Sequence, residues 1–217
     1  MPTVMIIGAS RGIGLELTRQ YAAAGWRVHA TTRTPASLGE LGKISGDMVH
    51  HELEVRNLDH ITALAKAVES EGIDVFIHNA GVSDRRMSSD EVLRINAEAP
   101  IVVTQALLPA VARGAAKKMV LMSSQLGARY GSSRRLSTYG ESKAALNDAF
   151  RERAPAWGQA GFIAIVMHPG WVRTDMGGAA ASLSVQESAS GVRQVIDGLT
   201  PAHHGRFWTW YGREHAW

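Results

Sequence analysis

The stretch IIGASRGIGLEL, residues 6–17, decides the fold. An apolar run from Val4 leads into it, three glycines follow, and a helical pattern then continues as far as Gly25. Glycine lets the backbone turn tightly and approach a ligand closely. The first turn of the helix behind such a loop offers free N–H groups and the positive end of the helix dipole. A strand, a glycine turn and a helix in this order predict a site for a pyrophosphate.

The three glycines are Gly8, Gly12 and Gly14, with the spacing G-x-x-x-G-x-G. This spacing differs from the G-x-G-x-x-G of many dinucleotide-binding folds. The alternative is a glycine-rich turn that binds nothing. The strand before the loop and the helix after it favour nucleotide binding.

The rest of the chain alternates strand-like and helix-like segments. We predict strands at residues 4–7, 27–32, 48–55, 73–77, 117–122, 162–167 and 206–210, and further helices at 58–69, 91–111, 138–157 and 186–196. Such alternation is typical of a parallel, doubly wound sheet with helices on both faces. We therefore expect an α/β Rossmann fold of about seven strands, with residues 1–217 forming one domain.

Composition narrows the functional classes. The 217 residues include no cysteine, so disulfides and thiolate metal sites are excluded, and the nine histidines show no convincing metal spacing. The net charge of +3 is too small to indicate a nucleic-acid or membrane partner. No apolar run approaches the roughly 20 residues that span a bilayer, and the N-terminus lacks the basic region of a signal peptide. We expect a cytoplasmic protein without a metal.

The residues after the second strand bear on the cofactor. An acidic side chain there would accept the ribose hydroxyls of NAD, but this chain has Thr32 followed by Arg33. Arg11 lies in the glycine loop, and two guanidinium groups could bind a 2′-phosphate through charge-assisted hydrogen bonds. This pattern predicts NADPH rather than NADH. The alternative is two solvated surface arginines.

Polar residues follow the later strands, at the edge of the sheet where open α/β folds bind ligands. They are Asn79, Ala80 and Gly81 after the fourth strand, Ser123 and Ser124 after the fifth, and Pro169, Gly170 and Thr174 after the sixth.

The segment STYGESKAAL, residues 137–146, places Tyr139 and Lys143 four positions apart. On a helix these side chains lie on one face, about one turn apart. An ammonium group near a phenol lowers the phenol's pKa, and such a tyrosine can exchange a proton near neutral pH. Chance occurrence of this spacing on one helix is the alternative.

Taken together, these motifs occur in the order found in the short-chain dehydrogenase/reductase family, which the chain resembles over nearly its whole length. The C-terminal segments SVQESASGVRQVIDGL and GRFWTWYGRE further resemble the small C-factor-like and carbonyl-reductase-like members. The resemblance is carried by the glycine loop, Asn79-Ala80-Gly81, Asn96, the serine pair, Tyr139-x-x-x-Lys143 and Pro169-Gly170.

The resemblance implies a role for each matching residue. Tyr139 would be the general acid for carbonyl reduction, and the base for alcohol oxidation. Lys143 would lower the pKa of Tyr139 and hold the nicotinamide ribose. Ser124, with Ser123 as the fallback, would hydrogen-bond the substrate carbonyl. Asn96, a polar residue within a long helix, would hold a water of a proton relay.

The same resemblance implies the set of cofactor-binding residues. Thr174 would contact the nicotinamide amide. The full set is Gly8, Ser10, Arg11, Gly12, Ile13, Gly14, Arg33, Glu54, Val55, Asn79, Ala80, Gly81, Tyr139, Lys143, Pro169, Gly170, Val172 and Thr174. Three positions depart from the family pattern: Ile7 replaces a threonine, His78 an asparagine, and Glu54 an aspartate.

The expected activity is the reversible, NADPH-dependent reduction of an aldehyde, ketone or quinone, with a lid around residues 175–192. Arg129, Arg134 and Arg135 would favour an anionic substrate, unless they belong to a solvated loop. Relatives with this fold form homodimers or homotetramers through the two long helices. A non-catalytic NADP(H) sensor of C-factor type is the main alternative. Nucleotide-sugar epimerases carry a larger C-terminal domain, for which 217 residues leave no room.

Overall fold

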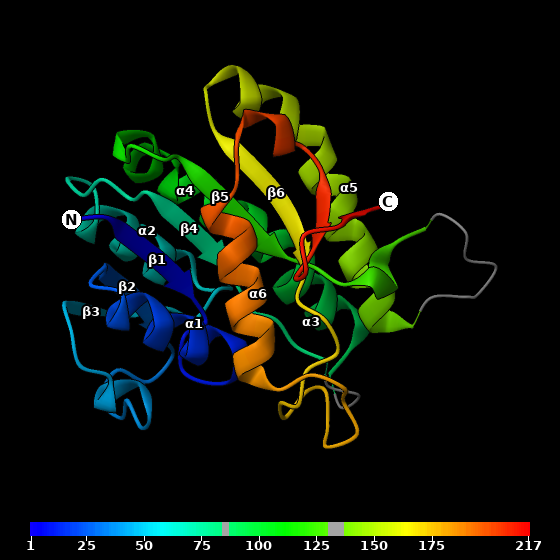
Figure 1. Cartoon of the computed structure of the whole chain (residues 1–217), viewed down its shortest axis with the longest axis horizontal. Coiled ribbons are helices and arrows are strands. Elements are labelled where there is room, and N and C mark those ends of the chain that lie inside the picture. Colours follow the sequence, from blue (N-terminus) through cyan, green and yellow to red (C-terminus); the bar gives the residue numbers. More distant parts are fainter. Residues whose placement is uncertain (84–86, 130–136) are drawn as a thin grey trace.

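A single eight-stranded sheet forms the centre of the computed structural model, which describes residues 1–83, 87–129 and 137–217 (Figure 1). The strands lie in the order β3-β2-β1-β4-β5-β6-β7-β8. The first seven run parallel, and β8 is antiparallel to β7. Their bounds are β1 Thr3–Ile7, β2 Arg27–Thr32, β3 Met48–Glu52, β4 Val75–His78, β5 Lys118–Met122, β6 Ile163–His168, β7 Phe207–Thr209 and β8 Glu214–His215.

Helices cover both faces of this sheet (Figure 1). They are α1 Gly12–Ala23, α2 Leu58–Ala67, α3 Ser89–Leu93, α4 Ala99–Arg113, α5 Thr138–Gln159 and α6 Val185–Asp197. Neighbouring residues of β1 show the division: buried Ile6 packs with α1 and α6, whereas buried Met5 packs with α2, α4 and α5. Each strand is therefore apolar on both sides, as a parallel sheet between two helical layers requires.

The predicted α/β Rossmann architecture is confirmed, with differences in detail. The sheet has one strand more than the seven expected, because the pairing of Glu214–His215 with Phe207 and Trp208 is too short and polar to leave a sequence pattern. The third strand ends at Glu52, before the predicted Val55.

The predicted helix at residues 91–111 is broken into α3, a π-helical turn at Arg94–Glu98, and α4. Pro100 accounts for part of the break, because proline has no N–H to donate to the carbonyl of Asn96 four residues earlier. The amide of Ala99 instead bonds the carbonyl of Arg94, five residues back. Such π-turns occur often at functional sites.

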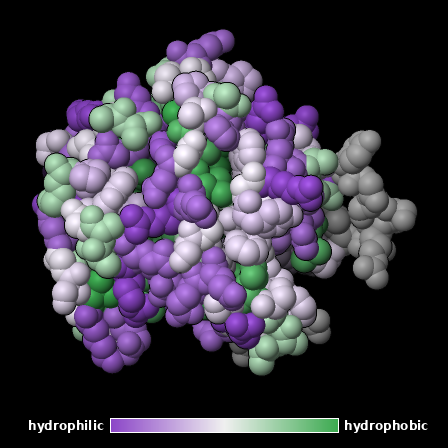
Figure 2. All heavy atoms as spheres, viewed as in Figure 1, coloured by the Kyte–Doolittle hydropathy of each residue, from purple (hydrophilic) through white to green (hydrophobic). Residues whose placement is uncertain are grey.

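The stretch Ser89–Arg113 is long and apolar enough to cross a membrane by length and composition, which differs from the expectation that the chain has no such run. Most of its apolar part is buried inside the protein, where α4 covers the sheet and contacts α2 and α5. Core helices of globular proteins have the same length and composition. Figure 2 shows that the opposite face, which carries α1 and α6, is mostly hydrophilic.

Candidate active site

Close backbone packing explains the glycines between β1 and α1. A Cβ at Gly8 would lie 2.9 Å from the backbone of Ala80, and one at Gly14 would lie 2.1 Å from the carbonyl oxygen of Gly8. Gly8 also has a φ of +83°, in the left-handed region that favours glycine. Asn79 Nδ2 donates to the Gly8 carbonyl at 3.0 Å, so the loop is fastened to the end of β4.

A threonine on the neighbouring strand also holds this loop. The Gly8 N–H donates to Thr31 Oγ1 at 2.9 Å, and the Ala9 N–H donates to the Thr31 carbonyl at 3.0 Å. Ile7 has no hydroxyl that could hold this turn, and Thr31 supplies the tie between the turn and β2. The sequence analysis missed Thr31, because no local pattern connects residues 23 apart.

The N-terminus of α1 is open to a ligand. Arg11 is the N-cap residue, yet its side chain makes no capping hydrogen bond, and the first turn contains no acidic residue. Ser10 beside it is exposed. Uncapped N–H groups and the positive end of the helix dipole suit an anion such as a pyrophosphate. The glycine cradle and this open helix end fit a dinucleotide.

Two of the residues expected around the adenosine end, Arg11 and Glu54, have other partners. Arg33 is exposed, and Arg11 Nη1 lies 2.8 Å from Asp175 Oδ2. Glu54 accepts a hydrogen bond from Arg56 Nε at 3.2 Å. Burial alone would raise the pKa of Glu54, but the hydrogen bonds from Arg56 outweigh it and the pKa lies below its usual value. Val55, next to it, is buried.

Tyr139 and Ser124 meet at the carboxyl end of β5. Ser137 caps α5 by accepting from the Gly140 N–H at 3.1 Å, which places Tyr139 in the first turn. Ser124 is the N-cap of the turn Gln125–Gly127, where its Oγ accepts from the Leu126 N–H at 3.1 Å, and its hydroxyl is near enough to Tyr139 to lower the pKa of the phenol. Ser123 is turned away and donates to Asn147 Oδ1 at 2.6 Å.

Lys143 lies one helical turn beyond Tyr139 and is only 4% exposed. Its Nζ donates to the Met122 carbonyl at 2.8 Å and lies 5.9 Å from the centre of the Tyr139 ring. Burial lowers the pKa of Lys143 to about 8. A Cβ on Gly81 would lie 3.5 Å from this Nζ, so the end of β4 forms the other wall of the lysine pocket.

The pKa of Tyr139 differs from the expectation that Lys143 lowers it. Burial of the phenol raises this pKa above its usual value, and the neighbouring Ser124 hydroxyl offsets the rise only in part.

Asn96 lies in the π-helical turn and is fully buried. Its side chain accepts from the Val82 N–H at 2.8 Å and donates to the Val82 carbonyl at 2.7 Å. It also donates to Ser142 Oγ at 3.0 Å, and Ser142 in turn donates to the Tyr139 carbonyl at 2.7 Å. The side chain thus joins the segment after β4 to the first turn of α5, a linkage that sequence reasoning missed.

The segment after β6 reaches back over the glycine loop. Gly170 has a φ of +92°, and a Cβ there would lie 2.3 Å from Leu183. Val172 forms an isolated bridge with Leu183. A Cβ on Gly12 would lie 3.3 Å from Thr174 Cγ2, so Thr174 stands directly above the start of α1. Pro169 accepts a hydrogen bond from Ser188 of α6 at 2.6 Å.

Two of the arginines proposed to attract an anionic substrate, Arg134 and Arg135, lie outside the described residues. Arg129 forms an ion pair with Asp148 at 2.7 Å on the side of α5. Within residues 1–83, 87–129 and 137–217, no group of three or more His, Asp or Glu side chains could hold a metal ion.

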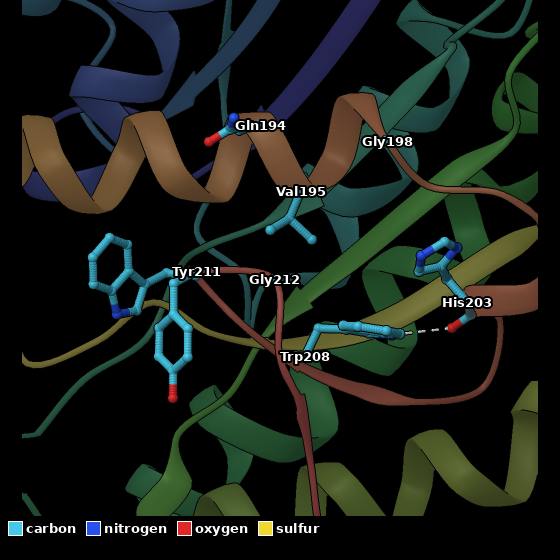
Figure 3. A pocket seen from close by; sticks show the side chains of 8 residues that line it. Gln194, Val195, Gly198, His203, Trp208, Tyr211 and Gly212 are labelled. Atoms are coloured by element: carbon cyan, nitrogen blue, oxygen red, sulfur yellow. Dashed lines mark hydrogen bonds between the residues drawn. The ribbon is translucent and has the colours of Figure 1, made fainter.

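A separate hollow of about 310 Å³ lies between the end of α6 and the turn after β7 (Figure 3). Neither Ser124, Tyr139 nor Lys143 lines it. Its residues are Gln194, Val195, Gly198, His203, Trp208, Trp210, Tyr211 and Gly212. Trp210 is the link to the active-site side, because a Cβ on Gly170 would lie 3.1 Å from its indole ring.

The sheet order, the open helix terminus behind a glycine loop and the Ser–Tyr–Lys cluster define a Rossmann-fold oxidoreductase. Comparison with known proteins agrees. The chain belongs to the short chain dehydrogenase family, whose profile matches residues 2–183.

Among curated proteins, the C-signal of Myxococcus xanthus is 38% identical over 164 residues, covering 71% of this chain and 99% of that protein. An uncharacterized oxidoreductase of Schizosaccharomyces pombe, C663.08c, is 32% identical and covers 95% of this chain and 94% of its own. Among solved structures, the carbonyl reductase Sniffer of D. melanogaster matches with a TM-score of 0.90 at 28% identity over all of both chains. The NADPH-bound carbonyl reductase from chicken fatty liver matches with a TM-score of 0.88 at 29% identity, over 100% of this chain and 99% of that one.

Proposed function

We propose that this protein is an NADPH-dependent carbonyl reductase that reversibly reduces an aldehyde, ketone or quinone to the alcohol. The observation that carries the proposal is the clustering of Ser124, Tyr139 and Lys143, with the Lys143 Nζ 5.9 Å from the Tyr139 ring, at the sheet edge where α1 presents its open N-terminus. The structures of similar fold include a carbonyl reductase with bound NADPH. That likeness supports both the reaction and the cofactor.

The side chains divide the reaction between them. NADPH, when bound, would supply the hydride for the carbonyl carbon. Ser124 Oγ–H donates to the carbonyl oxygen and stabilises its developing charge. Tyr139 transfers its phenolic proton to the same oxygen, which becomes the hydroxyl of the alcohol. The raised pKa of Tyr139 keeps the phenol protonated before reduction, as a proton donor requires.

Lys143 and Asn96 would support that proton transfer. The Met122 carbonyl fixes the Lys143 ammonium, which leaves its other N–H donors for a ribose hydroxyl. The Asn96 side chain is occupied by Val82 and Ser142, so its backbone carbonyl is the group left for a relay water. Pro100 frees that carbonyl because it has no N–H.

The cofactor would lie along the residues already placed at the sheet edge. Its diphosphate would rest on the N–H groups of Gly12, Ile13 and Gly14, and its 2′-phosphate against Arg33 and Arg11. Its nicotinamide end would face Thr174. Residues 175–192, which comprise the loop after Thr174 and the first turns of α6, would form the lid of a single-domain enzyme.

A panel of aldehydes, ketones and quinones tests the proposal, with the loss of reduced nicotinamide absorbance as the readout. We expect NADPH to be used in preference to NADH. Tyr139→Phe removes the proton donor but keeps the ring, and it should lower the rate by about 10²- to 10⁴-fold. Turnover that survives this change would contradict the assignment.

A second candidate, a non-catalytic NADP(H)-binding sensor, is favoured by the 38% identity with a protein named C-signal. The intact Ser–Tyr–Lys cluster argues for the enzyme, because a sensor needs no proton donor. NADPH binding by calorimetry, without turnover of any compound on the panel, would favour the sensor.

We also propose a cytoplasmic homodimer formed across α4 and α5. Val102 of α4 is 41% exposed, and its apolar side chain would be covered by such an interface. Val102→Glu should convert the dimer to a monomer in size-exclusion chromatography with light scattering. A monomeric unaltered protein would contradict the proposal.

A further inference from the structure

An ion pair connects the glycine loop to the lid. Arg11, the N-cap residue of α1, contacts Asp175, the residue after Thr174, with 2.8 Å between Nη1 and Oδ2. The two residues are 164 positions apart in the sequence. Their side chains are 67% and 79% exposed, so the pair lies at the mouth of the proposed cofactor site.

Asp175 is held in place independently of Arg11. Thr174 Oγ1 accepts from the Gly177 N–H at 3.1 Å, and the Thr174 carbonyl accepts from the Gly178 N–H at 2.9 Å. Trp171 Nε1 donates to the Gly177 carbonyl at 2.9 Å. These bonds fold the segment into a turn and hold the backbone of Asp175 near the start of α1.

Arg11 is also one of the two guanidinium groups proposed to bind the 2′-phosphate. Its ion-pair partner is the lid carboxylate, so one anion already contacts the group that would bind another. A phosphate binds a guanidinium more strongly than a single carboxylate contact does, because it offers more charge and bidentate geometry.

We propose, building on the function proposed above, that Asp175 sets the affinity and selectivity for the 2′-phosphate by competing with it for Arg11. Binding of NADP(H) releases Arg11 from the lid. Binding of NAD(H), which lacks this phosphate, leaves the ion pair in place. Asp175 is thus a specificity-determining residue that contacts the cofactor only through Arg11.

The size of the effect follows from the exposure of the pair. Exposed ion pairs are weak, so Asp175→Asn should tighten the binding of NADP⁺ by about two- to fivefold. Adenosine 2′,5′-bisphosphate, which has the phosphate but no nicotinamide, should gain by the same factor. NAD⁺ should gain less, because it does not recruit Arg11. Titration calorimetry measures all three without turnover.

Two further variants isolate the mechanism. Asp148→Asn is a matched control, because it removes the same charge from another exposed ion pair, with Arg129 at 2.7 Å, and should leave all three affinities unchanged. In an Arg11→Ala background, Asp175→Asn should no longer tighten NADP⁺ binding. A double-mutant cycle gives the coupling of the two side chains.

Each other outcome overturns the proposal in a distinguishable way. Weaker NADP⁺ binding by Asp175→Asn would mean that Asp175 orients Arg11 toward the phosphate instead of competing with it. A gain that persists without Arg11 would assign the effect to the lid or to general charge. If the unaltered protein prefers NADP⁺ but Asp175→Asn does not bind it more tightly, the role of Asp175 is overturned and the cofactor assignment stands. An unaltered protein that shows no preference for NADP⁺ over NAD⁺ overturns the cofactor assignment as well.

Discussion

Acid should destabilise this protein through His78, at the end of β4. The ring is 1% exposed, and its Nε2 has no hydrogen-bond partner. Burial, aided by the charge of Lys143, lowers the pKa of His78 to about 3. The imidazole of an unfolded chain has a pKa of about 6.5, so the unfolded state binds the extra proton first.

The difference between the folded and unfolded pKa values fixes the direction in which stability changes with pH. A folded pKa below the unfolded one means that stability is fully present above about pH 6.5 and falls as the pH decreases toward the folded value. One such group costs about 1.4 kcal/mol per pH unit in that window. At pH 5, which is about 1.5 units below the unfolded value, His78 alone should cost about 2 kcal/mol.

Urea unfolding at pH 7.5 and pH 5 measures this cost in the unaltered protein and in His78→Met. The methionine fills much of the same space and cannot titrate. The variant should lose about 2 kcal/mol less than the unaltered protein over this interval. Any stability lost through another buried histidine with a lowered pKa, such as His168, is the same in both proteins and cancels in the comparison. Equal losses would refute the reasoning, because they would mean that His78 titrates alike in both states.

Three further predictions concern the site itself. Ser124→Ala should lower kcat/KM by about 10²-fold. Ser123→Ala should instead lower mainly the free energy of unfolding, by about 1 kcal/mol, because the Ser123 hydroxyl bonds Asn147. Kinetics and urea unfolding of both variants test this, and a larger loss of kcat/KM in Ser123→Ala would move the assignment to Ser123. Gly14→Ala should abolish NADPH binding and lower the free energy of unfolding by about 2 kcal/mol or more, because the added Cβ would overlap the Gly8 carbonyl oxygen. Native NADPH affinity of this variant in calorimetry would contradict the packing. Thr31→Val should weaken NADPH binding by severalfold because it frees the Gly8 N–H. Thr62→Val, at an exposed position on α2, is its control, and equal affinities of the two variants in calorimetry would contradict this role of Thr31.

Local sequence pattern was enough to predict the architecture. The apolar runs of β1, β2 and β5 and the helix after Gly12 follow from hydrophobic periodicity and glycine chemistry alone. The resemblance to a known family then supplied the catalytic set, and the structure brings Ser124, Tyr139 and Lys143 together. Structural features that depend on one residue type at one position could therefore be predicted from the sequence.

Features that depend on distant pairs could not be predicted. The hydrogen bond of Thr31 with Gly8 and the ion pair of Arg11 with Asp175 join residues whose spacing along the chain carries no signal. The raised pKa of Tyr139 was missed for a related reason: spacing places a lysine nearby, but only the folded chain shows how much of the phenol is desolvated. The hydrophobic periodicity of residues 91–111 predicts one continuous helix, but the π-helical turn before Pro100 shows that a proline can change the helix locally.

The short strand β8 affects how the sheet meets other molecules. Without it, β7 would present unpaired N–H and carbonyl groups beside Phe207 and Trp208, and such an edge is a template on which strands of other chains can add. The antiparallel pairing with Glu214 and His215 occupies these groups. The new edge is only two residues long and carries a charged side chain, Glu214, that is ion-paired with Arg206. A short, charged edge of this kind disfavours the addition of strands from other chains.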